Sequence, residues 1–171
     1  MELSWVCPAS ERRLRRKFST RSSASPRTPW WRRSRRGSRA VAHLGAVSLL
    51  VRDYDEAIAF FVGKLGFELS EDTDMGGGKR WVRVTPKGGQ TSLLLARATT
   101  PDQTARIGDQ AGGRVWLFLE TDDLMRDHAA WSAAGVVFRE TPRHEPYGKV
   151  VVFEDLYGNA WDLIESARTG D

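Results

Sequence analysis

The chain has 171 residues, of which 40% are hydrophobic, so it is long enough to bury the core of one domain or of two small ones. No apolar run approaches the ~20 residues that a membrane helix needs, and a single cysteine, Cys7, excludes an internal disulfide framework. A lone thiol suits a reducing compartment, so we expect a cytoplasmic protein with no membrane partner.

The formal net charge of +4 hides an uneven distribution. Residues 1–40 hold 12 Lys and Arg against 2 acidic residues, whereas the rest of the chain holds 14 basic and 20 acidic residues. The first segment is rich in Arg and Ser and has no apolar period, so residues 1–41 are expected to form a disordered basic tail. It is an over-long gene model, a nucleic-acid-binding arm or an organelle transit peptide, and we favour the first. The acidic remainder makes nucleic acid an unexpected partner.

A folded domain is expected at residues 42–168. Alternating and β-branched residues predict four strands in its first half, at 46–51, 67–69, 79–85 and 91–96. Between the first two, Asp53 stands in the position of a helix N-cap, with Glu56 three residues later as in a capping box. Gly66 would end this helix. The glycine-containing stretch 72–78 is predicted to be a loop.

A long connection is expected at 99–113 before the second half of the domain. There the same reasoning predicts strands at 114–120, 136–139, 150–153 and 161–165. A helix capped by Thr121 or Asp122 follows the first of these strands, and Gly135 ends it. Residues 141–147 include two prolines and are predicted to be a loop.

The last two strands form a hairpin around the turn at 154–159. Alternation in its second strand places Trp161 and Leu163 on one face and Asp162 and Ile164 on the other. A carboxylate on an otherwise apolar strand is either paired within the fold or part of a site, and both interpretations remain open.

The order strand–helix–strand–strand–strand occurs twice, at about residues 44–98 and 113–165. Asp53 matches Asp122 and Gly66 matches Gly135, at a common offset of 69 residues. A repeat of this size predicts two copies of one supersecondary unit. We therefore predict an α+β fold of two βαβββ modules, each with a helix on one face of its sheet and a concave surface on the other.

Three motifs carry a family resemblance. They are VRDxxxAIAFF at 51–61, LGF at 65–67 and FEDxxGNxWDLIE at 153–165. In these residues the chain resembles the vicinal oxygen chelate superfamily, which includes glyoxalase I, extradiol dioxygenases and bleomycin-resistance proteins. The resemblance covers about residues 44–165 and implies a half-closed barrel around a concave groove. It does not imply one reaction, because the superfamily covers many chemistries.

Metal-dependent members of that superfamily carry one ligand on each of four strands. The positions that correspond here are Ala46, Leu94, Trp116 and Asp162. Only Asp162 can bind a hard cation, and one carboxylate does not make a divalent site. We predict no cofactor and no metal, with Asp162 as a ligand only if a metal is present.

The three histidines do not repair this deficit. His43 has the wrong parity for the concave face and is expected at a strand end or on the surface. His128 is expected on the solvent side of the second helix. His144 lies in the predicted loop beside the cavity mouth, where it is a candidate ligand contact.

Strand parity projects a mixed set of side chains into the groove. The predicted ligand-binding residues are Trp81, Arg83, Ser92, Leu94, Trp116, Phe118, Glu120, His144 and Asp162. The aromatic rings would stack a planar molecule, and Arg83 would hold an anionic group. In the alternative interpretation, Trp116 and Phe118 only fill the half-barrel, and Arg83 pairs with Asp162 or Glu120.

The sequence thus predicts a metal-independent, small-molecule-binding protein that resembles bleomycin-type drug-resistance proteins. Proteins of that branch usually dimerise, so we expect a homodimer. The ligand is expected to be planar and apolar with a charged group. The alternative is a divalent-metal-dependent enzyme, either a glyoxalase-like lyase or isomerase or an extradiol-dioxygenase-like oxidoreductase, so the question of enzymatic activity stays open.

Overall fold

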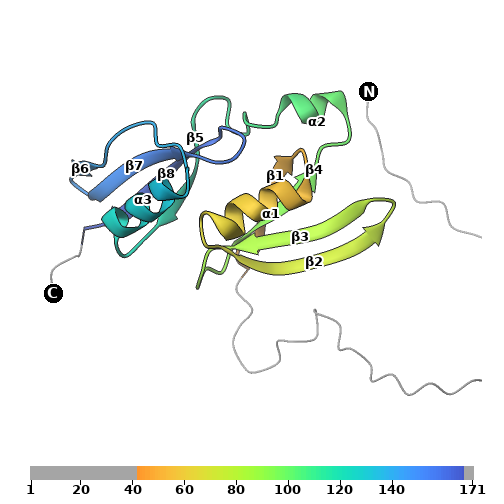
Figure 1. Cartoon of the computed structure of the whole chain (residues 1–171), viewed down its shortest axis with the longest axis horizontal. Helices are drawn as coiled ribbons and strands as arrows, with labels where there is room; N and C mark the ends of the chain where they lie inside the picture. Colours follow the sequence, from red (N-terminus) through yellow and green to blue (C-terminus); the bar gives the residue numbers. More distant parts are fainter. Residues whose placement is uncertain (1–41, 168–171) are drawn as a thin grey trace, which may run out of the picture. The chain divides into compact units, whose positions relative to one another are not determined.

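Two four-stranded sheets, one from each repeat, form the framework of the domain (Figure 1). The structure is a computed structural model that describes residues 42–167, so the predicted tail at 1–41 lies outside the described residues. The strands are β1 Ala46–Val51, β2 Glu68–Gly76, β3 Lys79–Thr85, β4 Ser92–Arg97, β5 Val115–Glu120, β6 Arg143–Glu145, β7 Gly148–Glu154 and β8 Ala160–Ser166. The helices are α1 Tyr54–Gly63, α2 Pro101–Ala105 and α3 Leu124–Ala133.

The predicted α+β architecture of two βαβββ modules is confirmed. The strand order is β1-β4-β3-β2 in the first sheet and β5-β8-β7-β6 in the second. In each sheet the first and last strands of the module pair in parallel, and the other neighbours are antiparallel. The two sheets are separate and do not close into a barrel, which leaves the groove half-open.

Local capping chemistry sets where the two long helices begin. Asp53 is the N-cap of α1 as predicted, because its Oδ1 accepts hydrogen bonds from the backbone N–H groups of Asp55 at 2.9 Å and Glu56 at 3.1 Å. The prediction for α3 is wrong by one or two residues. Its N-cap is Asp123, whose Oδ1 accepts from the backbone N–H of Arg126 at 3.0 Å, whereas Thr121 Oγ1 accepts from Asp123 N.

Several predicted loops contain regular structure. The strand predicted at 67–69 continues to Gly76, so most of the expected loop at 72–78 is the outer part of the β2–β3 hairpin. The connection at 99–113 contains α2, and the loop at 141–147 contains β6. Conversely, the strand predicted at 136–139 is reduced to one bridge, between Phe138 and Phe153.

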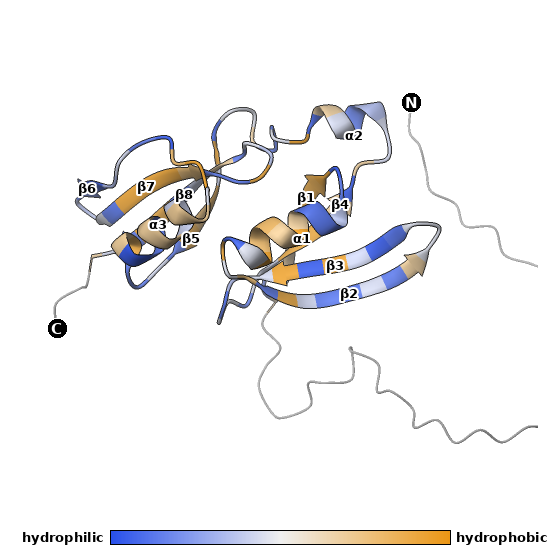
Figure 2. Ribbon diagram, viewed as in Figure 1, coloured by the Kyte–Doolittle hydropathy of each residue, from blue (hydrophilic) through white to orange (hydrophobic). Residues whose placement is uncertain are grey.

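Hydropathy explains why the length of β2 was underestimated. Figure 2 shows that β7 is apolar in its middle, whereas β2 is largely hydrophilic. Nearly all of β2 is exposed, so its sequence has no alternation of apolar and polar residues. It is held as a strand by its pairing with β3, in which Glu71 lies opposite Arg83 and Thr73 opposite Trp81.

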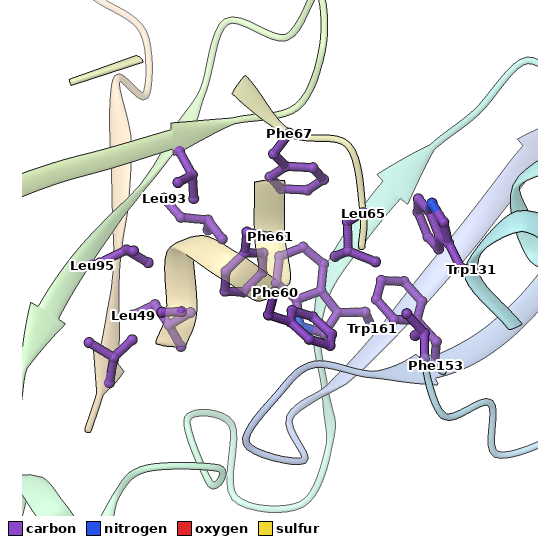
Figure 3. Packing of buried hydrophobic residues seen from close by; sticks show 14 of the residues in the cluster. Leu49, Phe60, Phe61, Leu65, Phe67, Leu93, Leu95, Trp131, Phe153 and Trp161 are labelled. Atoms are coloured by element: carbon purple, nitrogen blue, oxygen red, sulfur yellow. The ribbon is translucent and has the colours of Figure 1, made fainter. Parts of the chain in front are cut away.

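One aromatic core spans both modules (Figure 3). The ring of Phe61 on α1 lies 5.7 Å from that of Phe67 and 6.2 Å from that of Trp161 on β8. The Trp161 ring lies 5.8 Å from that of Phe153, which Trp131 of α3 meets edge-to-face at 5.3 Å. Because these rings pack on the helix-covered side of each sheet, the opposite side of each sheet is left for other contacts.

Candidate functional site

The side of each sheet that faces away from its long helix carries most of the predicted site residues, but not Trp116 or His144. We call the first face the residues Ser48, Leu50, Glu71, Trp81, Arg83, Ser92 and Leu94, which share one side of the first sheet by register. The second face is Phe118, Glu120, Arg143, Val152, Asp162 and Ile164 in the second sheet.

Arg83 is the centre of a polar network on the first face. Its Nη2 donates to Ser92 Oγ at 2.8 Å and to the carbonyl oxygen of Gly45 at 3.2 Å. The Ser92 hydroxyl lies 2.9 Å from Thr85 Oγ1, which lies 2.8 Å from Ser70 Oγ. This chain of hydrogen bonds ties Arg83 to its own sheet, so the Arg83–Asp162 and Arg83–Glu120 pairs of the alternative interpretation are not what the structure shows.

Glu71 is a first-face residue that the sequence analysis missed. Its Oε2 accepts from Trp81 Nε1 at 3.2 Å and lies 4.0 Å from Arg83 Nη1. Since Glu71 fell between the predicted strand and the predicted loop, only the pairing of β2 with β3 brings it to this face. The Trp81 ring is thereby held by its edge, with 40% of the residue exposed.

Asp162 lies in the middle of the second face, which also carries Glu120 and Arg143. It lies opposite Phe118 on β5 and Val152 on β7. Burial raises the pKa of the Asp162 carboxyl, and the charge of Arg143 lowers this pKa in part. Arg143, which lies in a loop by sequence, belongs to β6 and donates from Nε to Glu145 at 3.0 Å.

Two buried side-chain atoms of residues 42–167 lack a hydrogen-bond partner, and both belong to predicted polar contacts. They are Arg83 Nε on the first face and Asp162 Oδ1 on the second. Buried polar groups in folded proteins are nearly always paired, so each unpaired one calls for an explanation. Arg83 Nε is a hydrogen-bond donor and Asp162 Oδ1 is an acceptor. Each face therefore has one buried polar atom without a hydrogen bond.

Phe118 and Trp116, the two predicted aromatic contacts of the second module, differ in burial: Phe118 is exposed, whereas Trp116 packs against the core. Phe118 is 64% exposed on the second face. Trp116 is an extra residue in the β5–β8 pairing, because Val115 pairs with Ala160 and Leu117 with Trp161. Its ring packs edge-to-face on that of Trp161 at 5.5 Å, so Trp116 fills the core at least in part, and its contact with a ligand stays a prediction.

The remaining predicted residues line cavities. Trp81 and Leu94 line a cavity of about 430 Å³ beside the first sheet. Glu120 and His144 line a second one, of about 520 Å³, at the far end of the other sheet. Glu120 also borders a cavity of about 660 Å³ that contains Trp131 and Lys87.

The other two histidines stand apart from both faces. His43 is exposed, as expected. The prediction for His128 is wrong, because this residue is half-buried and its ring packs 4.3 Å from that of Phe138. Helix periodicity alone does not predict this contact, because Phe138 belongs to the segment that follows α3.

The residues present do not fit the divalent metal that the enzyme members of the resembled superfamily use. Among residues 42–167, no three His, Cys, Asp or Glu side chains come together in a way that could hold a metal ion. Carboxylate, imidazole and thiolate groups are what such ions require, and Ala46, Leu94 and Trp116 offer none.

No helix in this described range is long and apolar enough to cross a membrane.

Comparison with known proteins gives a consistent picture. The family model of the Glyoxalase/Bleomycin resistance protein/Dioxygenase superfamily matches residues 41–163. A Shewanella frigidimarina protein of uncharacterised function is 54% identical over 121 residues, which are 70% of this chain and 90% of that protein. The uncharacterised Bacillus subtilis protein YetH is 28% identical over 73% of this chain and 99% of its own.

Two solved structures are similar over nearly their full length. TnmS3, an antibiotic binding protein from a Streptomyces species, is 32% identical, with a TM-score of 0.62 and coverage of 76% of this chain and 100% of that one. A superfamily member from Sphaerobacter thermophilus is 29% identical, with a TM-score of 0.63 and coverage of 74% and 98%.

Proposed function

The chain belongs to the Glyoxalase/Bleomycin resistance protein/Dioxygenase superfamily, and on that premise we propose that it binds a planar, apolar small molecule with a charged group and without a metal ion. Its polar contacts are Arg83 and Asp162, and its stacking contacts are Trp81 and Phe118. The proposal extends to a cytoplasmic protein that acts as a homodimer.

The observation that carries this proposal is the pair of buried, unpaired atoms, Arg83 Nε and Asp162 Oδ1. Leaving a buried donor or acceptor unsatisfied costs about 1–3 kcal/mol. The two atoms lie in different sheets and solvent reaches neither of them, so a ligand that accepts a hydrogen bond from one and donates to the other recovers this free energy once both side chains turn towards it. The exposed rings of Trp81 and Phe118 lie on the first and second face. Ligand sites typically combine such aromatic area with a few polar groups.

Three further observations support it. TnmS3, which is similar over its full length, is described as an antibiotic binding protein. The ring of Phe118 is mostly exposed in a single copy of the chain, and a second copy would remove that apolar area from water. The donor set at the metal positions, described above, favours recognition by side chains alone.

The test is a thermal-shift screen of planar antibiotics and related aromatic compounds, followed by calorimetric titration of the compounds that stabilise the protein. In Asp162→Asn the affinity should fall at least about tenfold, which corresponds to ~1.4 kcal/mol. Arg83→Lys, which keeps the charge but loses Nε, should weaken the same compounds.

Arg114→Lys is the matched control. Arg114 is exposed, belongs to neither face and has no ion pair among the described residues. Melting curves of each variant establish that it is folded. Failure of every planar compound to bind would contradict the proposal. So would an affinity that survives both Asp162→Asn and Arg83→Lys in folded protein.

A further inference from the structure

The charged residues that line the cavity of about 430 Å³ beside the first sheet are all positive. It lies where β3 begins and β4 ends, and its charged lining residues are Lys79, Arg80 and Arg97, with no carboxylate among the residues described there. We call it the basic pocket. Its volume is within the range of small-molecule sites, about 300–1,000 Å³.

Only one of these cations is neutralised. Arg80 Nη1 lies 2.7 Å from Asp55 Oδ1, and its Nε donates to Asp72 Oδ1 at 2.9 Å. Lys79 and Arg97 have no ion pair and no side-chain hydrogen bond within the described part of the chain. The basic pocket therefore keeps two positive charges that its own walls do not balance.

Arg97 is positioned without losing its donors. Its guanidinium lies over the ring of Tyr54 at 5.6 Å from the centroid, a cation–π contact that leaves the N–H groups free. Gly78 of the β2–β3 hairpin also lies close to this guanidinium, because a Cβ at Gly78 would lie 3.2 Å from Arg97 Nη2. A planar guanidinium with free N–H groups matches the geometry of a carboxylate.

The rest of the lining is suited to an aromatic ring. Leu50, Leu94 and Ala96 give an apolar wall, and the exposed Trp81 ring completes it. Leu50, Leu94 and Trp81 belong to the first face, so the basic pocket is continuous with the surface to which we assign the ligand. Cationic and apolar groups thus meet within one cavity.

We propose that the basic pocket receives the carboxylate of a planar aromatic ligand, with Arg97 and Lys79 as its ionic contacts and Trp81 as the surface on which the ring stacks. This inference rests on the proposed function and narrows it to aromatic carboxylates. A ligand of this class would have its anionic end beside β3 and β4 and its hydrogen-bond-donating groups directed to other parts of the groove.

The experiment compares 2-naphthoate with 2-naphthamide, a neutral compound of nearly the same shape, by calorimetric titration of the full chain. The naphthoate should bind at least tenfold more tightly, and its affinity should fall as salt is raised. In Arg97→Gln and Lys79→Gln this preference should shrink at least fivefold, while the amide affinity stays unchanged. Arg97→Lys should restore part of it.

Lys87→Gln is the control, since Lys87 is an exposed lysine in the turn after the opposite end of β3 and does not line the basic pocket. Equal binding of the two compounds, or a preference that survives both pocket variants in folded protein, overturns the inference and leaves the proposed function standing. Absence of naphthoate binding also overturns it. The proposed function fails separately, if the antibiotic screen and the Asp162 variant give negative results.

Discussion

Asp155 and Asp162 lie in the same β7–β8 hairpin, and burial raises the pKa of both carboxyls, but only Asp155 is surrounded by donors. Asp155 Oδ1 accepts from the backbone N–H groups of Tyr157 at 2.9 Å and Asn159 at 3.0 Å. Its Oδ2 accepts from Asn159 Nδ2 at 2.8 Å and Trp161 Nε1 at 3.4 Å. Asp162 Oδ1, by contrast, is buried with no partner. The first carboxylate builds the turn, whereas one oxygen of the second meets no donor among the described residues.

The first prediction concerns Asp155. Asp155→Ala should lower the free energy of unfolding by about 2 kcal/mol or more, because each buried donor left without an acceptor costs about 1–3 kcal/mol. Urea denaturation followed by circular dichroism measures the change. Asp109→Ala is the control, since Asp109 is exposed and its one ion pair among the described residues, with Arg106 at 3.9 Å, lies on the surface, where such pairs contribute little to stability. Equal stabilities of the two variants would show that the turn does not depend on Asp155.

The second prediction concerns the pH dependence that Asp162 causes. Its pKa is raised in the folded state, so the folded protein binds a proton there more tightly than the unfolded chain does, in which the carboxyl has its ordinary pKa of 3.8. This group therefore makes the wild type less stable as pH rises from about 3.8 through the raised pKa. Asp162→Asn lacks this loss, so its stability relative to the wild type should increase over that interval and then level off.

Urea denaturation of both proteins at intervals between pH 3.5 and 7.5 tests this expectation. Asp155→Asn gives the necessary comparison, because it should be less stable than the wild type at neutral pH, where its amide cannot accept all of the hydrogen bonds that Asp155 accepts. A stability difference between Asp162→Asn and the wild type that does not change with pH would contradict the prediction.

The third prediction concerns metal content. Purified protein should contain no stoichiometric zinc, nickel, manganese or iron by elemental analysis, because Ala46, Leu94 and Trp116 stand where the metal-dependent relatives are expected to carry ligands. Tightly bound metal that is lost in Asp162→Ala would refute this expectation. It would restore the interpretation of the chain as a lyase, isomerase or dioxygenase.

The fourth prediction concerns the basic segment. Deletion of residues 1–41 should change the melting temperature by no more than about 2 °C, since its composition gives it too little apolar surface to pack on the domain. Scanning calorimetry of both chains at the same ionic strength measures the difference. A decrease of many degrees would show that the segment contributes to the stability of the fold.

The sequence predicted best those elements whose signals are local. β1 and the cap of α1 at Asp53 are as expected, because alternation and side-chain capping act within a few residues. β2 was cut short because nearly all its residues are exposed, so only its pairing with β3 identifies it. The α3 cap was misplaced for a different reason: Thr121, Asp122 and Asp123 are all residue types that cap helices, and sequence alone does not rank them.

The candidate site divides in the same way. Asp162 was identified as the exceptional residue of its strand because it is a carboxylate among apolar residues, and its Oδ1 is one of the two unpaired buried atoms among the described residues. Glu71, Arg97 and Arg143 were missed, because their positions depend on neighbours from other elements. The bulge that turns Trp116 towards Trp161 also has no signal in the sequence, since it is a property of how β5 pairs with β8.

The contact between Phe61 and Trp161 joins the two repeats through a single core. Trp161 is only 2% exposed, and its ring is enclosed by side chains from both halves of the domain. Pulling one repeat away would expose that ring and the apolar area around it, so each half stabilises the other. We therefore expect the two repeats to melt together, as one calorimetric transition whose van't Hoff and calorimetric enthalpies agree.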